Sequence, residues 1–322
     1  MQAICVGELL IDFTPGTQAD SYVRHAGGAP ANVAVMLQRG GIETGFLGKV
    51  GDDDFGRFLV RTLEDNGVRL LCQPYTEEAV TTLAFVTLAP NGERSFTFAR
   101  KPGADLLLRR KDIPEDAVQQ CTLLHAGSVS LTAEPSRVAV RYAMELAHGM
   151  GKLVCFDINY REMLWSREAA KQQVDAVLPM VDLLKFSEEE LDFVAEEAQM
   201  EAFMQKFDVP LMVQTLGAKG ARYYLRSQSG FRQGFVEGFC VHAVDATGAG
   251  DAFWGGFLAA LLRRGVTSRA QLSEDTVRQA LEEANCCGAL CVQKKGGIPA
   301  LPFWQEVQNA ALPKRQAAQQ DD

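Results

Sequence analysis

Residues 245–262 read Asp-Ala-Thr-Gly-Ala-Gly-Asp-Ala-Phe-Trp-Gly-Gly-Phe-Leu-Ala-Ala-Leu-Leu, and this segment constrains the fold more than any other part of the chain. A glycine turn at 248–250 leads directly into an apolar helix. The start of a helix presents unpaired N–H groups and the positive end of the helix dipole, and glycine lets an anion approach the backbone. We expect Val236–Val244, which precedes the turn, to be a strand. Together these features predict an α/β fold with an anion site at the turn.

The carboxylate of Asp251, in the first turn of this helix, is the candidate general base. Beside an anion site it would repel a phosphate group, unless it accepts the proton of a hydroxyl group that attacks that phosphate. A helix cap or a partner of the helix dipole is the simpler alternative. Because the chain has no G-x-x-x-x-G-K-[S/T] sequence, the backbone of Gly248, Ala249 and Gly250 would hold the phosphate oxygens.

Composition and charge narrow the class of protein. The chain has 322 residues, of which 47% are hydrophobic, and a net charge of −9, which argues against nucleic acid and anionic membranes as partners. Residues 1–8 do not resemble a signal peptide, and no apolar stretch approaches the ~18 residues that a membrane span needs. The eight cysteines form no C-x-x-C pair, and the four histidines have no metal-binding spacing. We therefore expect a cytoplasmic protein with reduced, mostly buried cysteines.

Short apolar runs alternate with longer segments of helical periodicity along most of the chain. The expected strands are Ile4–Val6 with Leu9–Ile11, Thr44–Val50, Leu123–Ala126, Leu153–Asp157, Leu183–Phe186 and Pro210–Thr215. The expected helices are Pro30–Arg39, Asp54–Asn66, Pro135–His148, Glu168–Leu178 and Glu188–Ala195. This alternation predicts a mainly parallel sheet with helices on both faces.

Two regions interrupt the alternation. Asp12–His25 and Thr81–Arg100 have the two-residue periodicity of strands and contain no helices of their own, so we expect them to form a small β-lid beside the main sheet. Residues 313–322 are polar and rich in glutamine, and we expect a disordered tail there. Residues 1–312 would then form a single domain.

Three segments, in the same order along the chain, resemble the signatures of one family. They are Gly27-Gly28-Ala29-Pro30-Ala31-Asn32-Val33-Ala34, Asp245–Phe253, and Asn285-Cys286-Cys287-Gly288-Ala289-Leu290 with the following Gly296–Pro302. The chain is similar to the ribokinase-like sugar kinases, also called the phosphofructokinase-B family, from Gly7 to Pro302. Within that family it looks most like the fructokinases. The resemblance implies a three-layer fold, with the β-lid covering the sugar and often forming a dimer contact.

The resemblance also implies an activity and a sugar site. The activity is ATP-dependent phosphorylation of D-fructose to fructose 6-phosphate, with Asp251 as the base and Gly248, Ala249 and Gly250 as the anion hole. The residues implied on the sugar side are Asp12, Gly28, Asn32, Arg100 and Arg161. For each arginine a structural salt bridge is an equal alternative, and Ile158 stands where the family usually has proline.

Nucleotide and cation sites follow from the same resemblance. The nucleotide residues are Thr215, Gly217, Gly220 and Asn285, the last of which is expected to open a helix near the adenine. Glu190 matches the family glutamate that orders Mg²⁺ through water, although Ser187 replaces the usual asparagine and Ser-x-x-Glu is also a capping box. The residues implied for a monovalent cation such as K⁺ are Asp245 and Thr247, with backbone carbonyls near Cys291, Lys294 and Gly296.

Other functions remain open at this point. Kinases of aminoimidazole riboside, ribose, nucleosides and 2-keto-3-deoxygluconate share the catalytic motif. Fructokinase-like regulatory proteins keep the fold but typically lose the base or the anion hole, both of which this chain retains. A dinucleotide-binding enzyme is disfavoured because no G-x-G-x-x-G follows the first strand.

Overall fold

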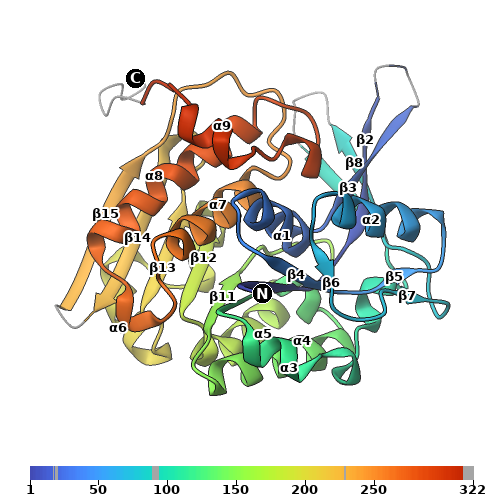
Figure 1. The fold of residues 1–322 in the computed structure, drawn as a ribbon, viewed down its shortest axis with the longest axis horizontal. Coiled ribbons are helices and arrows are strands. Elements are labelled where there is room, and N and C mark those ends of the chain that lie inside the picture. The colour runs from blue at the N-terminus through green and yellow to red at the C-terminus, as the bar shows by residue number, and fades with distance from the viewer. Residues whose placement is uncertain (17, 19–20, 89–93, 228–229, 315–322) are drawn as a thin grey trace.

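The computed structural model describes residues 1–16, 18, 21–88, 94–227 and 230–314. The main body contains a large sheet. Among the described residues this sheet has nine strands, in the order β15-β14-β13-β12-β11-β10-β1-β4-β6. The strands are β1 (Ala3–Val6), β4 (Thr44–Leu47), β6 (Arg69–Leu70), β10 (Leu123–Gly127), β11 (Leu153–Asp157), β12 (Leu183–Ser187), β13 (Leu211–Thr215), β14 (Gly220–Ser227) and β15 (Gly230–Glu237). From β6 to β13 in this order, each strand is parallel to its neighbours. Strand β14 is antiparallel to β13, and β15 is antiparallel to β14 (Figure 1).

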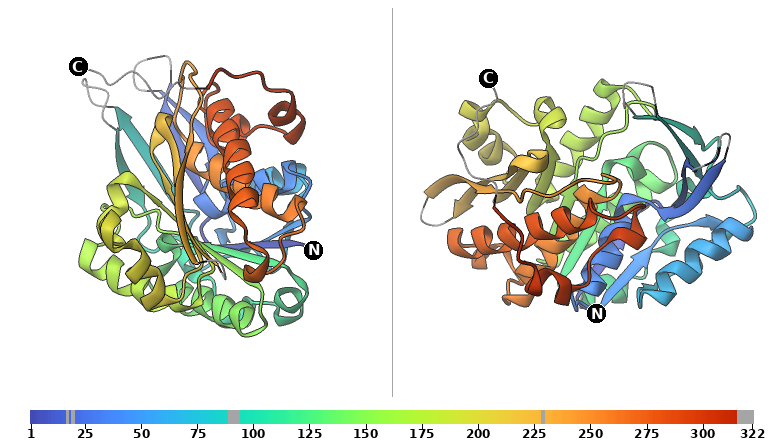
Figure 2. Two further views of the ribbon diagram at one scale, coloured as in Figure 1. Left: turned by 90° about the vertical axis from the view of Figure 1, so that its left-hand side faces the viewer. Right: turned by 90° about the horizontal axis from the view of Figure 1, so that it is seen from above.

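Helices cover both faces of the sheet, so the molecule has three layers (Figure 2). The helices are α1 (Ala29–Arg39), α2 (Asp54–Asp65), α3 (Glu115–Gln120), α4 (Ser136–Gly149), α5 (Arg167–Val177), α6 (Met200–Phe207), α7 (Ala249–Arg263), α8 (Glu274–Cys291) and α9 (Trp304–Asn309). Alternate residues of a strand point to opposite faces: Ala3 and Cys5 of β1 pack with α1 and α7, whereas Ile4 and Val6 pack in the core beneath α4.

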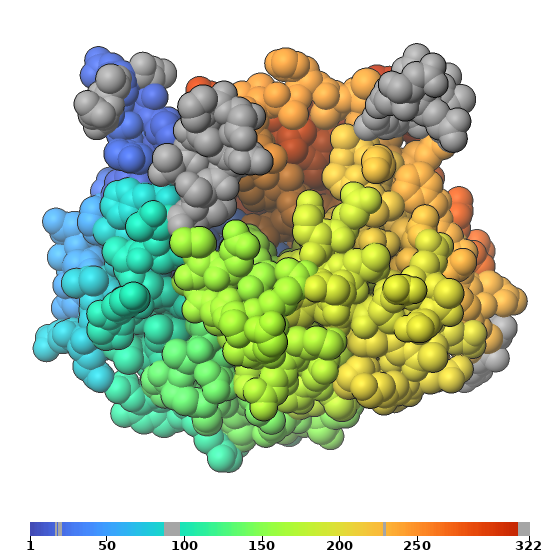
Figure 3. All heavy atoms as spheres, turned by 180° about the vertical axis from the view of Figure 1, so that it is seen from behind, coloured from blue at the N-terminus to red at the C-terminus, as the bar shows by residue number. Residues whose placement is uncertain are grey.

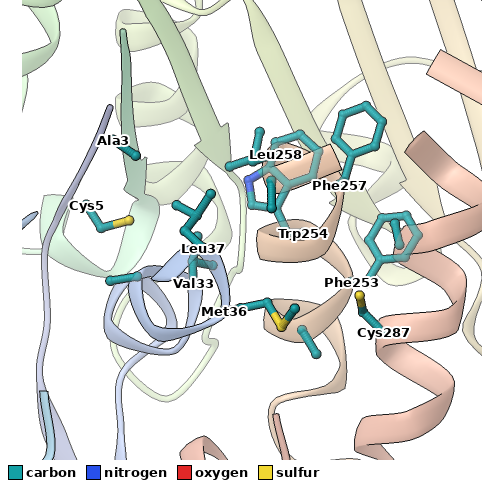
Figure 4. Packing of buried hydrophobic residues seen from close by; sticks show 14 of the residues in the cluster. Ala3, Cys5, Val33, Met36, Leu37, Phe253, Trp254, Phe257, Leu258 and Cys287 are labelled. Carbon is teal, nitrogen blue, oxygen red and sulfur yellow. The ribbon is translucent and has the colours of Figure 1, made fainter. Parts of the chain in front are cut away.

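The core on the α7 side holds the candidate catalytic helix in place. Trp254 and Phe257 stack with their ring centroids 5.3 Å apart, and Met36 of α1 packs beside them (Figure 4). Gly255 and Gly256 lie where α7 meets its neighbours, and a Cβ on them would come within 2.6 Å of Met36 and 2.5 Å of Cys287. The small residues of α7 therefore allow α1 and α8 to approach it closely, which fixes where its first turn points.

A separate sheet forms the lid, as the sequence predicts. Its described strands have the order β3-β2-β8-β9, with bounds β2 (Leu10–Pro15), β3 (Tyr22–Gly27), β8 (Leu83–Leu88) and β9 (Arg94–Ala99). A short two-stranded sheet, β5 (Val50–Gly51) with β7 (Tyr75–Thr76), lies near α2 in Figure 1. Phe13 and Phe85 stack in the lid at 5.0 Å, and Phe13 packs edge-on against Phe55 of α2, which joins the lid to the main body.

Three sequence predictions need correction. The strand expected at Val236–Val244 is instead β15, which ends at Glu237, and residues 238–248 form an irregular segment. The helix expected at Glu188–Ala195 is a 3₁₀ helix, η5 (Glu188–Phe193). Of the expected disordered tail, residues 315–322 lie outside the described part, whereas Pro313 and Lys314 contact the segment at 239–240. None of the described helices is long and apolar enough to cross a membrane.

Candidate active site

The first turn of α7 lies at the carboxyl edge of the parallel strands, where α/β sheets place their ligands. Gly248 caps α7 in a left-handed conformation, with φ of 77°, which favours glycine. A Cβ on Gly248 would lie 3.2 Å from the Cα of Gly297, so the C-terminal signature segment packs directly against this turn. Two of the three segments that suggest the family therefore meet at the expected anion site.

A hydrogen bond between Asp251 of α7 and Asn32 of α1 joins these two helices at the site. Asn32 of α1 donates from Nδ2 to Oδ2 of Asp251 over 2.7 Å. Burial raises the pKa of Asp251, and the nearby Asp157 carboxylate adds to that shift; the hydrogen bond from Asn32 and the charges of Lys185 and Arg161 oppose it. A carboxylate with a raised pKa is a better proton acceptor than an ordinary aspartate, as a general base requires.

Asp12 lies on the lid strand β2 and faces the same site. Burial, followed by the Asp251 carboxylate, raises its pKa to about 7, and Arg161 lowers it. Its carboxylate occupies the space beside Gly27, where a Cβ would lie 2.0 Å from Oδ2 of Asp12. Gly28 has φ of 108°, and a Cβ there would lie 2.4 Å from the carbonyl oxygen of Glu8. The two glycines therefore let the lid strand and the start of α1 come together around Asp12.

The two candidate arginines occupy different surroundings. Arg100 is buried and donates to Asp105 from Nε over 2.9 Å, and to Oγ1 of Thr132 over 2.8 Å. This geometry favours the alternative of a structural ion pair for Arg100. Arg161 is only partly buried, and its charge acts on both Asp12 and Asp251, so it remains a candidate for the sugar site.

Sequence reasoning missed a buried ion pair in this site. Lys185 of β12 donates from Nζ to Oδ2 of Asp157, at the end of β11, over 2.8 Å, and their side chains are 7% and 2% exposed. Burial lowers the pKa of Lys185, but the carboxylates of Asp157, Glu190 and Asp251 together outweigh it, so the net shift is upward. Glu190 lies beside them, and its carboxylate accepts hydrogen bonds from the backbone N–H groups of Tyr160 and Ser187. The available signal was a lysine within an otherwise apolar strand.

A cavity of about 780 Å³ begins at the glycine turn and extends away from Asp251. The expected nucleotide residues Thr215, Gly217, Gly220 and Asn285 all line it, together with Ala249 and Gly250. Asn285 does not open a helix, because α8 begins at Glu274; its side chain donates to the carbonyl oxygens of Val236 and Glu237 over 3.1 Å. From behind, Figure 3 shows a hollow between the blue lid strands and the yellow segments, with an orange-to-red floor.

The expected cation residues gather next to the turn. Oδ1 of Asp245 accepts from the N–H and the hydroxyl of Thr247, at 3.0 and 2.7 Å, and its Oδ2 accepts from the N–H of Gly296 over 3.0 Å. Cys291 lies 3.7 Å from the carbonyl oxygen of Thr247, and Lys294 forms an ion pair with Glu306 over 2.9 Å. In the described residues no cluster of three His, Cys, Asp or Glu side chains could hold a metal ion.

Comparisons with known proteins agree with this geometry. The model of the pfkB family of carbohydrate kinases matches residues 2–304. The chain is 42% identical to a probable fructokinase-4 of Arabidopsis thaliana over 318 residues, or 95% of each protein.

Two solved structures are also similar. One is a fructokinase from Xylella fastidiosa with bound ATP, with a TM-score of 0.87, 34% identity, and 95% and 97% of the two chains covered. The other is a fructokinase double mutant from Vibrio cholerae O395 with fructose, ADP and a potassium ion, with a TM-score of 0.84, 37% identity and the same coverage. Because the family model covers residues 2–304 and a relative is 42% identical over 95% of each protein, the chain belongs to the pfkB family of carbohydrate kinases.

Proposed function

We propose that this chain transfers the γ-phosphoryl group of ATP to the primary 6-hydroxyl of D-fructose. The observation that supports this most strongly is the position of Asp251, between the Asp12–Asn32 side of the site and the cavity at Ala249 and Gly250. A sugar hydroxyl beside Asp251 would face a phosphate held at the turn. The fructokinase relatives, at 42% and 37% identity, support fructose as the sugar.

Each group of residues then has a role in the transfer. Asp251 accepts the hydroxyl proton as the oxygen attacks the γ-phosphorus, and the N–H groups of residues 248–250 stabilise the phosphate oxygens. Asp12 and Asn32 orient the sugar hydroxyls, with Arg161 balancing the charge of Asp12. The cavity lined by Thr215, Gly217, Gly220 and Asn285 holds the nucleotide.

Cations would be held at two places. Mg²⁺ would accompany the nucleotide phosphates near Glu190; both oxygens of that carboxylate already accept backbone hydrogen bonds, which fits contact through water. A monovalent cation such as K⁺ would be held near the Asp245 carboxylate and the carbonyls around Cys291, Lys294 and Gly296. Bound there, it would fix the shape of the glycine turn, because Gly296 and Thr247 both bond to Asp245.

The lid would close over the sugar and join two copies of the chain. The strand register aligns Asp12 with Ala84 and Ala84 with Phe98, so Phe98 lies on the lid face that also contains Asp12. On the edge strand β3, Tyr22 and Val23 are half exposed. An exposed edge with apolar side chains is suited to pairing with a second lid, so we propose a homodimer in the cytoplasm.

The substrate is tested by measuring ATP consumption with a panel of ketoses, aldoses, nucleosides and keto acids. We expect kcat/KM to be highest for fructose and product analysis to give the 6-phosphate. A higher kcat/KM for ribose, aminoimidazole riboside or 2-keto-3-deoxygluconate would replace fructose with that compound. No consumption with any acceptor, in a folded protein that binds ATP, would favour a regulatory role.

A further inference from the structure

The buried pair Lys185–Asp157 lies within the site and has no role in the transfer as described so far. Lys185 is the third residue of β12, between Leu184 and Phe186, which are both fully buried. Removing two charges from water costs several kcal/mol, and apolar residues of similar size are often as stable or more stable in such places. Packing alone therefore gives no reason for a lysine at this position.

The ammonium group of Lys185 points to the glycine turn. A Cβ built on Gly250 would lie 3.7 Å from Nζ and 3.9 Å from Cε of Lys185, so the ammonium lies beside the first turn of α7. Its positive charge lowers the pKa of both Asp251 and Glu190. Lys185 therefore lies close to the proposed base Asp251, to Glu190 of the proposed magnesium site, and to the glycine turn.

The other cations near the site differ from Lys185 in their partners or their burial. Arg100 is bonded to Asp105 and Thr132, and Arg161, which is only partly buried, acts on Asp251 and on Asp12 of the sugar side. Lys219 in the 3₁₀ helix η7 (Gly217–Lys219) is 65% exposed and lies 3.9 Å from Glu188. Of these residues, Lys185 is the buried cation at the turn.

A second observation separates this pair from a structural salt bridge. Oδ1 of Asp157 is buried and has no hydrogen-bond partner among the described residues. A structural ion pair is stable only when its remaining lone pairs are satisfied. The free oxygen therefore indicates that a further group, such as water brought with the nucleotide, completes the pair when substrates bind.

We propose that Lys185 binds the transferring phosphoryl group and neutralises the charge that develops on it, with Asp157 holding the ammonium in position. This rests on the proposed function and deepens it. The sugar oxygen forms its bond to the γ-phosphorus while the bond from that phosphorus to the bridging oxygen breaks, and ADP leaves with the electron pair. The hydroxyl proton passes to Asp251, and Lys185 stays protonated throughout. A fixed cation of this kind stabilises the transition state more strongly than it stabilises the bound substrates, and so it raises kcat.

The test is a double-mutant cycle with Lys185→Met, Asp157→Asn and the double variant, using the sugar that the wild type phosphorylates best. We expect Lys185→Met to lower kcat about 10²- to 10³-fold, the loss typical of one oxyanion-stabilising donor, with little change in KM for the sugar. The same replacement in the Asp157→Asn background should cost a smaller factor, because the lysine there has already lost the carboxylate that holds it in position.

A matched control is available in Lys49, whose ammonium is also buried. It forms an ion pair with Asp112 at a distance of 3.3 Å, and this pair lies outside the site. Lys49→Met should lower the melting temperature without lowering kcat. If Lys185→Met retains the wild-type kcat, or if adding Asp157→Asn to Lys185→Met restores the wild-type kcat, the lysine only neutralises Asp157 and the inference is wrong. An inactive wild type would instead overturn the proposed function, and this inference with it.

Discussion

At the scale of single residues, the site is a set of carboxylates held close together in a buried place. The pKa values of Asp251 and Asp12 are both raised, because burial disfavours their charged forms, and the Asp251 carboxylate adds to the shift of Asp12. Asp251→Asn keeps the shape of the side chain but removes the proton acceptor. We expect kcat to fall about 10²- to 10⁴-fold while ATP still binds, measured by steady-state kinetics and calorimetry. Wild-type turnover in this variant would show that Asp251 is not the base.

Asp12 links the sugar site to stability. Its pKa in the folded protein is about 7, well above that of an exposed aspartate, so the unfolded chain releases this proton at lower pH than the folded one. The folded state therefore loses stability as pH rises from about 4 to about 7. Asp12→Asn should raise the melting temperature at pH 8 by on the order of a few degrees, with no gain at pH 4.5, and should raise KM for the sugar. An equal gain at both pH values would show that charge is not the cause.

The sequence could supply only part of this cluster. Asp251 lies beside a recognisable glycine turn, so it could be suggested as a base from the sequence, whereas Asp12 and Asn32 are implied by the family resemblance; the structure brings the three together. Lys185 and Asp157 meet only because β11 and β12 are neighbours in the sheet, and Arg100 reaches Asp105 through a chain turn. Pairings of this kind depend on tertiary arrangement, which a single sequence does not display.

At the scale of elements, the cavity proposed for the nucleotide shows how a short terminal segment can contribute to a site. The backbone N–H of Cys240 donates to the carbonyl oxygen of Pro313 over 2.9 Å, and Lys314 pairs with Phe239 and forms an ion pair with Glu282. Lys314 and residues 238–241 line the cavity. The apolar run before the glycine turn predicted a strand here, but the actual strand ends at Glu237, which leaves this segment free to form the cavity wall.

Truncation tests this contribution. A chain that ends at Leu312 loses the Pro313 and Lys314 contacts, and we expect KM for ATP to rise about 3- to 10-fold, as for the loss of roughly one hydrogen bond. The KM for the sugar should not change. A chain that ends at Lys314 keeps both contacts and serves as the control. Equal KM values for ATP in the two truncated chains would remove the terminal segment from the nucleotide site.

At the scale of the whole molecule, alternation of strands and helices predicted the three layers, because local periodicity reports which faces are buried. The order of strands in the sheet and the pairing of β2 with β8 across the lid could not be predicted, since both depend on contacts between distant segments. The lid leaves β3 as an edge strand in the described sheet, with Tyr22 50% and Val23 49% exposed. This edge is the basis for the proposed dimer.

The oligomeric state tests that proposal directly. A lysine on an edge strand discourages pairing with another strand, because a charge would have to be buried in the interface. If the lids join two copies, Val23→Lys should shift the mass measured by light scattering from twice 35.2 kDa toward one chain. Val138 of α4 is also 49% exposed and lies outside the lid, so Val138→Lys should leave the dimer intact. A wild-type mass of one chain, or dissociation in both variants alike, would show that the lid edge is not the interface.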